Sequence, residues 1–505
     1  MKERLYIKKS LSIVGTESGF STLEVLIAMV IMVLTMTAVI LVLFGGQTLT
    51  TDAQTNQEAI YKAQEWLERA RGSASLDFDS VDAIPPTNDD IYTRELVIDT
   101  SRSTNCKKEV ISKVTWNASP TRPQLVELTT DFSNASLAFQ LAGDCPTNPP
   151  IGTGNDLTEV FSINEPTSGE TTGLDVLRKF VYLGLDSSPG FIIFNAASPS
   201  SAFKINVTNG FSLPNRVNEI DAADHPSDGK TYAYIANDNT VAPFWQLLVV
   251  DVTTKNAPVT VASESLPGVT GTCPFSCPQG RSVFFFDDKV YVGTHRLLAA
   301  GAKEFHVYDV ADPTSPQHLG SYKLDHNVND ILVTKQDVAG IEKTIAYLAT
   351  SADSKELIVL DVTTPGAISE INSLDIPLSI IDAVSLDLDK TKNIIYLGRD
   401  SGGGSELYAI DIENLQTPLA ASDIKDSANV GDSVLGIRAV GNFVYLGVDS
   451  TTGEFQIWDS NPTNLSLINN MNISNKSATG VDYDDNYIYL SIEQGSKTLS
   501  ILYAP

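Results

Sequence analysis

The chain has 505 residues, of which 42% are hydrophobic and 19% are charged, and it contains 33 glycines and 24 prolines. This composition is typical of a folded protein with many turns, and the length predicts more than one domain. The formal net charge of −28 argues against nucleic acid as a partner, because that binding depends on Lys and Arg side chains that neutralise phosphates.

The N-terminus combines a basic leader, residues 1–19, with an almost unbroken apolar run over residues 25–44. A helix of about 20 residues spans about 30 Å, enough to cross a bilayer. No basic residue follows the leader until Lys62, so the positive-inside bias places the leader in the cytoplasm and the rest of the chain outside. A secretory signal would be cleaved after the apolar stretch, at small residues that the sequence at 43–46 does not match well.

Glu24 is unusual, because a carboxylate deep in a membrane and without a partner costs about 2.5 to 3.5 kcal/mol. The sequence from Gly19 and Phe20 to Glu24, followed by the apolar run, resembles the class III signal of type IV pilins and pseudopilins. The resemblance implies that a prepilin peptidase cuts after Gly19 and that Phe20 becomes a methylated N-terminus. It also implies that Glu24 pairs with the amino group of a neighbouring subunit. The alternative is a plain signal anchor in which Glu24 is accidental.

An amphipathic helix is expected after the apolar run, because Ile60, Ala63, Leu67 and Ala70 recur at steps of three and four residues. We expect it to continue the membrane segment and to end near Gly72. Residues 91–98, 108–117 and 124–131 alternate apolar and polar side chains, as half-buried strands do. A long helix over 20–72 on a small antiparallel sheet over 73–145 is also the α+β body that the pilin resemblance implies.

The four cysteines form two separated groups, an even number that suits two disulfides in an exported chain. A bridge from Cys106 to Cys145 would close a loop of about 40 residues and stabilise a small domain by a few kcal/mol. The alternative is two unpaired thiols. Cys273 and Cys277 have no second pair to complete a zinc site and suit a small loop disulfide, with an oxidoreductase motif as the alternative.

Residues 146–157 have the Pro, Gly and polar composition of a linker, and a repeat begins after them. Each repeat has an apolar strand around a tyrosine, a polar turn, and a second apolar strand that usually ends in Asp. The tyrosines are Tyr182, Tyr234, Tyr291, Tyr347, Tyr396, Tyr445 and Tyr489. Their spacing of roughly 44 to 57 residues is the period of β-propeller blades. The sequence predicts an all-β propeller of seven blades over 158–505; a β-solenoid or two sandwiches are the alternatives.

The last repeat ends at Pro505 before its fourth strand, whereas residues 158–163 form a spare strand ahead of the first repeat. We expect this strand to close the ring, which removes the exposed edges of an open array. The stretch from Tyr291 to Pro313 resembles the repeats of bacterial surface propellers. That resemblance implies an architecture and no particular ligand.

An acidic residue stands four positions after the tyrosine in most repeats. These residues are Asp186, Asp238, Asp400, Asp449 and Glu493, with His295 and Ser351 as exceptions. Equivalent turns of a propeller emerge on one side, so a partial circle of carboxylates is expected there. It could hold calcium, which prefers oxygen ligands, or attract a cationic partner. The alternative is that these are turn residues whose side chains cap their own backbone.

The sequence gives no indication of an enzyme. Four of the five histidines, His295, His306, His318 and His326, fall within one repeat, but without a metal-ligand spacing or a His-Glu-x-x-His motif. There is no Gly-x-Ser-x-Gly elbow and no phosphate-binding glycine loop.

Together with these patterns, the resemblance implies a minor type IV pilin or pseudopilin, first a single-pass protein of the cytoplasmic membrane and then part of an extracellular filament at the cell surface. Its partners would be prepilin peptidase, other pilin subunits and an extracellular glycan, protein or surface bound by the propeller. Two alternatives are a secretion-system pseudopilin whose propeller selects cargo and a surface-tethered propeller hydrolase or lyase.

Overall fold

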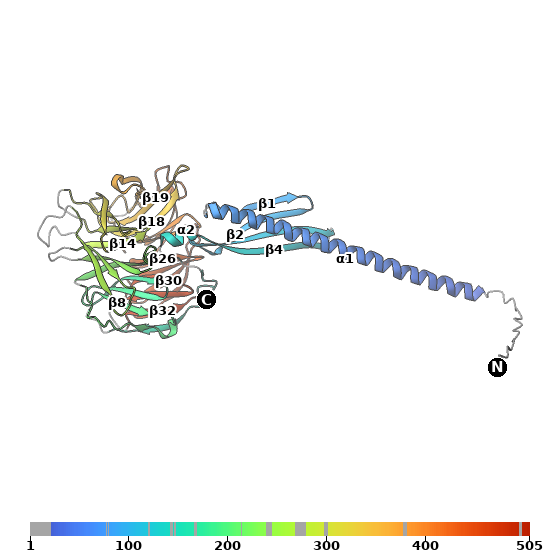
Figure 1. The fold of residues 1–505 in the computed structure, drawn as a ribbon, viewed down its shortest axis with the longest axis horizontal. Coiled ribbons are helices and arrows are strands. Elements are labelled where there is room, and N and C mark those ends of the chain that lie inside the picture. The colour runs from blue at the N-terminus through green and yellow to red at the C-terminus, as the bar shows by residue number, and fades with distance from the viewer. Residues whose placement is uncertain are drawn as a thin grey trace, which may run out of the picture. The chain divides into compact units, whose positions relative to one another are not determined.

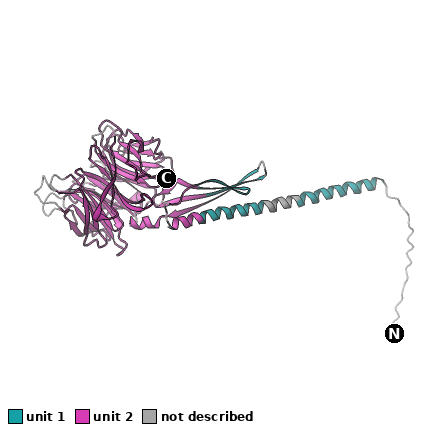
Figure 2. Cartoon of the chain, turned by 90° about the horizontal axis from the view of Figure 1, so that it is seen from above, with its two compact units in different colours: residues 1–68, 84–96, 112–128 teal, residues 69–83, 97–111, 129–505 magenta. Residues whose placement is uncertain are grey.

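The structure is a computed structural model of the 505-residue chain. It describes residues 22–76, 78, 80–119, 122–141, 145, 148–165, 169–213, 215–238, 245–267, 279–296, 301–376, 381–493 and 497–505. The chain forms two compact units. Unit 1 comprises Met1–Glu68, Ile84–Leu96 and Ser112–Leu128, and unit 2 comprises Arg69–Ala83, Val97–Ile111 and Thr129–Pro505 (Figure 2).

One helix, α1 (Thr22–Leu76), runs without interruption from unit 1 into unit 2. It confirms that the apolar and amphipathic segments are continuous, and it extends past the predicted end at Gly72, because a single glycine weakens a helix without ending it. The segment Val25–Leu43 has a mean hydropathy of 3.0 and is long and apolar enough to cross a membrane. Further along α1, Ala59, Ala63 and Trp66 are buried.

A four-stranded sheet follows, with the strand order β1-β2-β3-β4. The strands are β1 (Ile84–Asp89), β2 (Tyr92–Thr104), β3 (Lys107–Ser119) and β4 (Arg122–Ser133). Three of them lie where alternation predicted strands. β1 was not predicted, because its sequence Ile-Pro-Pro-Thr-Asn-Asp does not alternate. It lies at the edge of the sheet and pairs with β2, a position that tolerates proline.

The core of unit 1 joins α1 to this sheet. Ala59 and Ala63 pack against Tyr92, Val114 and Trp116 in one buried cluster. The alanines are small enough to let the helix approach the aromatic rings closely. The second half of the helix is therefore covered by the sheet, as the apolar stripe required.

After the short helix α2 (Ala135–Gln140), the described part of 158–505 contains seven four-stranded sheets. The first three are β6 (Thr171–Leu177), β7 (Phe180–Leu185), β8 (Phe191–Asn195), β9 (Phe203–Lys204); β10 (Arg216–Asp224), β11 (Thr231–Asp238), β12 (Leu247–Asp251), β13 (Val259–Glu264); and β14 (Gly280–Phe286), β15 (Lys289–Thr294), β16 (Phe305–Asp309), β17 (Gln317–Tyr322). The next two are β18 (Val328–Asp337), β19 (Glu342–Thr350), β20 (Leu357–Asp361), β21 (Ser369–Leu374); and β22 (Ala383–Asp389), β23 (Ile394–Arg399), β24 (Leu407–Asp411), β25 (Ile424–Ala428). The last two are β26 (Val434–Val440), β27 (Phe443–Val448), β28 (Phe455–Asp459), β29 (Leu467–Met471); and β30 (Ala478–Asp484), β31 (Tyr487–Ile492), β32 (Leu499–Tyr503), β5 (Thr158–Ile163).

The sheets form a propeller-like all-β domain (Figure 1). Their first strands contact one another in the order β6, β10, β14, β18, β22, β26, β30, and β30 contacts β6 again. The last sheet takes its fourth strand from the start of the domain: β32 pairs with β5, from Leu499 opposite Ile163 to Tyr503 opposite Thr158. This pairing confirms the expected role of residues 158–163 in closure.

The repeated tyrosine and aspartate have structural roles in every sheet that carries them. All seven tyrosines lie on second strands and are buried. The aspartate, or Asn195 in the first sheet, ends the third strand, and its side chain accepts the backbone N–H two residues later at 2.8 to 3.0 Å. This is an Asx turn, which explains why the residue recurs.

The chain between the two predicted domains differs from the linker expected at 146–157. Its described part, 148–157, is docked on the last sheets: the N–H groups of Ile151 and Gly152 donate to the carbonyl of Pro505 at 2.9 and 2.6 Å. Leu157 packs against the buried cluster that contains Phe443. The segment belongs to unit 2, which also contains the end of β2, the start of β3 and α2. The boundaries of the compact units therefore do not follow the predicted boundary at 145.

Candidate functional site: the cavity within the ring of sheets

A cavity of about 680 Å³ lies within the ring and is lined by residues of the first strand of every sheet. Acidic side chains outnumber arginines along its wall, with Glu219, Asp330 and Asp387 among the acids and Arg438 among the bases. This excess of carboxylates makes the cavity the strongest candidate for a binding site. What each carboxylate does decides the chemistry that the cavity can offer.

Most of the inner carboxylates join neighbouring sheets. Each accepts a backbone N–H from the first strand of the next sheet at 2.5 to 2.9 Å. The pairs are Asp175 with Ala222, Glu219 with Val283, Asp221 with Phe285, Asp330 with Leu386, Asp387 with Ala439, and Asp482 with Val176. Four of these aspartates lie opposite the repeat tyrosine in the strand register. Sequence reasoning missed them because their partners lie in another repeat.

Polar side chains near the start of the first strands form a second set of bonds between sheets. Asn218 donates to the carbonyl of Gly280, Ser282 to that of Val328, Asn329 to that of Ala383 and Ser385 to that of Val434, at 2.5 to 3.1 Å. A strand irregularity precedes or includes each position. Such irregularities re-aim side chains, here toward the neighbouring sheet.

Glu219 and Asp330 come from different sheets, and both line the cavity. Burial raises the pKa of Asp330 to about 7. Burial and the charge of Asp330 raise the pKa of Glu219 well above its usual value. At neutral pH the two groups therefore hold more protons than exposed carboxyls would.

Arg438 compensates part of the negative charge of Asp387 and Asp482. Its Nε lies 3.2 Å from Asp482 Oδ1. Burial raises the pKa of Asp387, and the Arg438 charge opposes that rise. This part of the cavity wall thus combines two partly compensated carboxylates with one guanidinium.

The acidic residues predicted to form a partial circle lie at the ends of the second strands, and some of them line the cavity. Asp238, Asp449, Glu493 and His295 line the cavity, together with Arg216 and Arg281. Asp186 and Asp400 are not among its lining residues. In the described part of the chain, no three His, Cys, Asp or Glu side chains form a group that could hold a metal.

These residues have local hydrogen-bond and charge partners. Asp186 Oδ1 accepts the N–H of Glu170 at 2.9 Å. Asp449 and Glu493 both accept from the hydroxyl of Ser477. Burial raises the pKa of Asp238, opposed by the charge of Arg216, and burial with the charge of Asp400 raises that of Asp382. The rim is therefore a mixed polar surface in which several carboxylates serve local loops.

The structure brings together two of the four clustered histidines. His306 Nδ1 lies 3.4 Å from His318 Nε2, and His306 Nε2 lies 2.9 Å from the carbonyl oxygen of Lys303. Burial lowers the pKa of His306 to about 4, so this histidine is neutral at pH 7. His295 is separate and lies on the cavity wall, with Nδ1 2.7 Å from Asn327 Oδ1.

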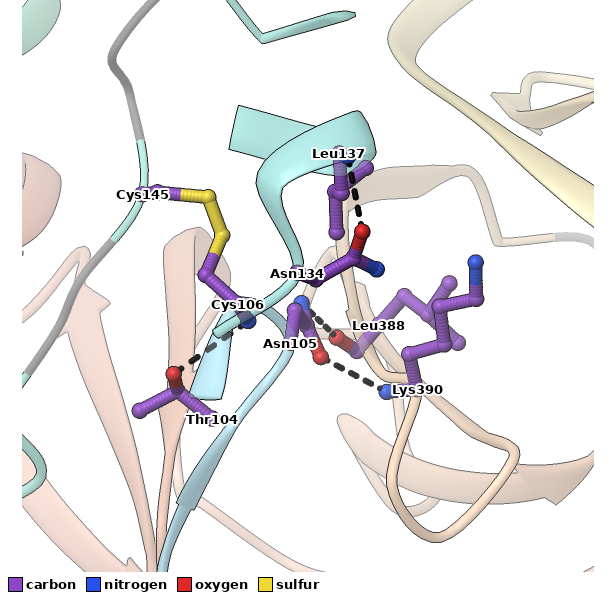
Figure 3. The surroundings of a disulfide bond; sticks show 8 residues. All are labelled: Thr104, Asn105, Cys106, Asn134, Leu137, Cys145, Leu388 and Lys390. Atoms are coloured by element: carbon purple, nitrogen blue, oxygen red, sulfur yellow. Dashed lines mark hydrogen bonds between the residues drawn. A yellow bond between two sulfur atoms is a disulfide. The ribbon is translucent and has the colours of Figure 1, made fainter. Parts of the chain in front are cut away.

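The processing and cysteine predictions are only partly within the described residues. Gly19, Phe20, Cys273 and Cys277 lie outside them, and Glu24 lies on α1 without a described side chain. Cys106 and Cys145 form a disulfide with a Cα–Cα distance of 5.7 Å (Figure 3). Cys106 belongs to the β2–β3 turn, which contacts the ring of sheets.

Comparisons with known proteins give no family. No protein-family model matches the chain, and no curated protein resembles it in sequence. Solved structures that align with it include the computationally designed Ika8 protein, at 15% identity over 68% of this chain and 99% of that one, with a TM-score of 0.43. Saccharomyces cerevisiae Sqt1 aligns at 13% identity over 66% and 84%, with a TM-score of 0.44. U3-55K aligns at 10% identity over 70% and 100%, with a TM-score of 0.45. At these values the likenesses carry no argument about function.

Proposed function

We propose that this chain is a minor type IV pilin or pseudopilin that presents a seven-bladed β-propeller on an extracellular filament. The observation that carries the proposal is helix α1. Its first part is a 19-residue apolar segment, Val25–Leu43, with none of its surface buried within the chain. Its second part packs on a small sheet through Ala59 and Ala63. A helix with one half covered and the other half bare needs a second apolar environment for the bare half.

The membrane supplies that environment before assembly, and the helices of other subunits supply it afterwards. Met29, Leu41 and Val42 are 66%, 69% and 74% exposed in the isolated chain, and burying each such side chain is worth about 1.5 to 3 kcal/mol. Glu24, at the start of this segment, would pair with the amino group of Phe20 in a neighbouring subunit. That pairing would set the register of the helices in the filament.

The propeller is the binding part in this proposal. Its ligand would approach the face that bears Asp238, Asp449 and Glu493, because the body residues of unit 2 contact the turns at the opposite ends of the strands. A domain larger than the pilin body would crowd a filament if every subunit carried it. We therefore expect the chain to occupy only occasional positions along the filament, or its tip.

Processing tests the proposal directly. The full-length chain is expressed with a prepilin peptidase, and the N-terminus of the product is sequenced. We expect a mature chain that begins at Phe20, and we expect Gly19→Ala to keep the leader. A wild-type chain that is cut near Gly46, or that is not cut at all, would contradict the pilin assignment.

Incorporation into filaments is the second readout. Glu24→Gln keeps the size of the side chain and removes its charge, so the chain should still be cut after Gly19 but should be depleted from purified filaments at least tenfold. Glu68→Gln, an exposed acid further along α1, is the matched control and should enter normally. Equal incorporation of both variants would exclude the role assigned to Glu24.

A further inference from the structure

Residues at the β2–β3 turn and around α2 are docked against the ring of sheets. We name these residues the plug: residues 101–106 at the β2–β3 turn, and 134–141 with Cys145 around α2. The plug contacts the turns that join first to second strands. The N–H of Asp287 donates to the carbonyl of Gln140 at 2.9 Å, and the N–H of Lys390 donates to Asn105 Oδ1 at 2.9 Å.

Apolar side chains seal the same contact. Cys106 and Leu137 are 4% and 5% exposed and belong to a buried cluster with Phe286 and Tyr291 of the third sheet. Asn105 also donates from Nδ2 to the carbonyl of Leu388 at 3.1 Å, so it bonds the fifth sheet in both directions (Figure 3). Between the plug and the first strands remains a small cavity of about 80 Å³, lined by Asn105, Leu137, Asp387 and Arg438 among others.

The plug is cross-linked to itself. The Asn134 N–H donates to the carbonyl of Cys106 at 2.8 Å, and the Asn134 side chain caps α2 by accepting the N–H of Leu137 at 2.9 Å. The disulfide then ties the chain that leaves α2 back to the β2–β3 turn (Figure 3). The two segments can leave the ring only together while the disulfide is intact.

We propose that the plug is a disulfide-held latch that closes one end of the propeller cavity and makes the ring of sheets and the docked body residues one cooperative unit. The cavity then has a single mouth, on the side of Asp238, Asp449 and Glu493, and a ligand can enter only there. This inference does not depend on the filament, because it concerns contacts within unit 2.

Hydrogen exchange of the full-length protein in detergent tests the latch. Peptides that contain Asp287 and Lys390 report on the plug contacts, and the turn at 338–341, where Gly340 has open space around it, is the internal reference. In the wild type we expect exchange at Asp287 and Lys390 to be at least tenfold slower than at the reference turn. Comparable exchange at all three turns would overturn the proposal.

Two variants separate the latch from general stability. Cys106→Ser with Cys145→Ser removes the disulfide, and Asn105→Ala keeps the disulfide but removes both bonds to the fifth sheet. Both variants should speed hydrogen exchange at Asp287 by at least tenfold, although neither changes Gln140, which accepts the Asp287 N–H. Peptides of β27 should stay protected in both variants. If the cysteine variant does not fold, Asn105→Ala decides. Unchanged protection of Asp287 in the folded variants would mean that the plug is not a latch.

Discussion

At the scale of single residues, many carboxylates of this acidic chain accept backbone N–H groups. Aspartates at the ends of third strands form Asx turns, and aspartates on first strands bond the next sheet. A third set of buried side chains, four glutamates and one glutamine, stands just before the third strand: Gln246, Glu304, Glu356, Glu406 and Glu454. These side chains accept N–H groups of the loop that follows the fourth strand. Buried N–H groups need such partners.

Glu406 tests this role, because its Oε2 accepts the N–H groups of Val430 at 2.8 Å and Gly431 at 3.3 Å. Glu406→Ala leaves both without an acceptor and should lower the free energy of unfolding by roughly 2 to 4 kcal/mol. Glu406→Gln keeps one oxygen, as Gln246 does in the second sheet, and should cost less than about 1 kcal/mol. Urea unfolding at pH 7 measures both. Equal losses would show that the side-chain oxygen is not needed.

Glu219 and Asp330 make stability depend on pH. Their folded pKa values lie above their ordinary values, so the folded chain binds more protons than the unfolded chain between about pH 4 and the raised values. The free energy of unfolding should therefore fall as pH rises through this window. The loss should be complete above the raised pKa values.

Glu219→Gln removes one of the two charges and keeps an oxygen for the N–H of Val283. We expect it to be more stable than the wild type by about 1 kcal/mol at pH 8 and nearly equal at pH 5. Glu170→Gln, a change at an exposed acid of the same cavity, should leave the pH profile as in the wild type. Melting temperatures between pH 5 and pH 8 check this, and a Glu219→Gln profile parallel to that of the wild type would refute it.

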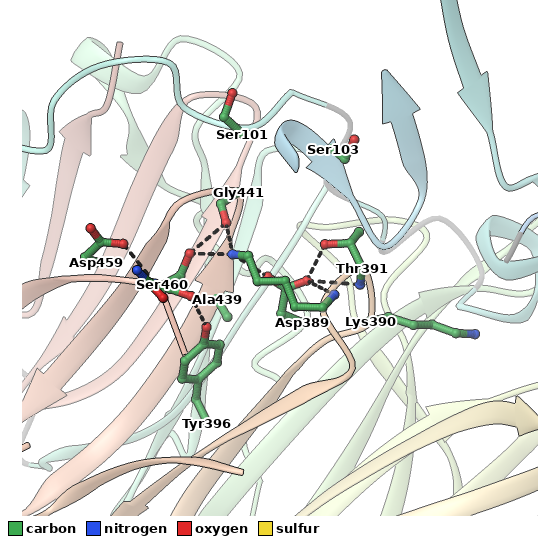
Figure 4. Close-up of polar contacts among 12 residues, drawn as sticks. Ser101, Ser103, Asp389, Lys390, Thr391, Tyr396, Ala439, Gly441, Asp459 and Ser460 are labelled. Carbon is green, nitrogen blue, oxygen red and sulfur yellow. Dashed lines mark hydrogen bonds and ion pairs between the residues drawn. The ribbon is translucent and has the colours of Figure 1, made fainter. Parts of the chain in front are cut away.

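At the scale of elements, the turns between first and second strands form hairpins, and some of them also contact the docked body residues. Gly441 has φ +60°, and an added Cβ would lie 3.0 Å from the carbonyl oxygen of Ser101 and 3.1 Å from Cβ of Pro149 (Figure 4). Gly340 occupies the corresponding turn of the fourth sheet with φ +77° and open space around it. A comparison of alanine variants at Gly441 and Gly340 therefore separates the cost of backbone strain, which both share, from the cost of contact with the docked residues, which only Gly441 has.

Gly441→Ala and Gly340→Ala should both lose about 1 kcal/mol, because a side chain is strained at positive φ. Gly441→Ala should lose at least about 1 kcal/mol more, since the carbonyl of Ser101 must move away. Thermal unfolding of the two variants measures the difference. If they lose the same amount, the contact at Gly441 contributes nothing to stability.

Strand β5 is the element that closes the ring, and its two faces differ. Phe161 packs against the buried cluster that contains Ile501, whereas Ser162 is exposed and pairs with Ser500. Phe161→Asp should cost at least about 2 kcal/mol through lost burial and a poorly solvated charge. Ser162→Asp, as the control on the same strand, should cost less than about 1 kcal/mol. If the denaturant midpoints of the two variants shift equally, the burial of Phe161 on the inner face of β5 does not contribute to stability.

At the scale of the whole molecule, the chain is built from local repeats that long-range bonds join. Each sheet buries its own tyrosine, but the junctions between sheets depend on carboxylates and hydroxyls whose partners lie in the next repeat. Tyr396 shows the same principle in a neutral pair, since its hydroxyl donates to the carbonyl of Ser460 in the next sheet at 2.6 Å (Figure 4). The net charge of −28 is thus partly an architectural feature, because many of the acids are held by backbone donors.

The sequence by itself determined the long helix, the repeat with its tyrosine and aspartate, and the spare strand at 158–163. Each of these depends on periodicity or on counting within neighbouring residues, and hydrophobic burial enforces such patterns locally. The tertiary structure alone decided that Glu219 and Asp330 face one cavity, that Glu406 caps a distant loop, and that 148–157 is docked. It also decided that the predicted carboxylate circle is divided among local partners. Those outcomes depend on which groups that lie far apart along the chain come within about 3 Å of one another, and no local sequence pattern specifies that.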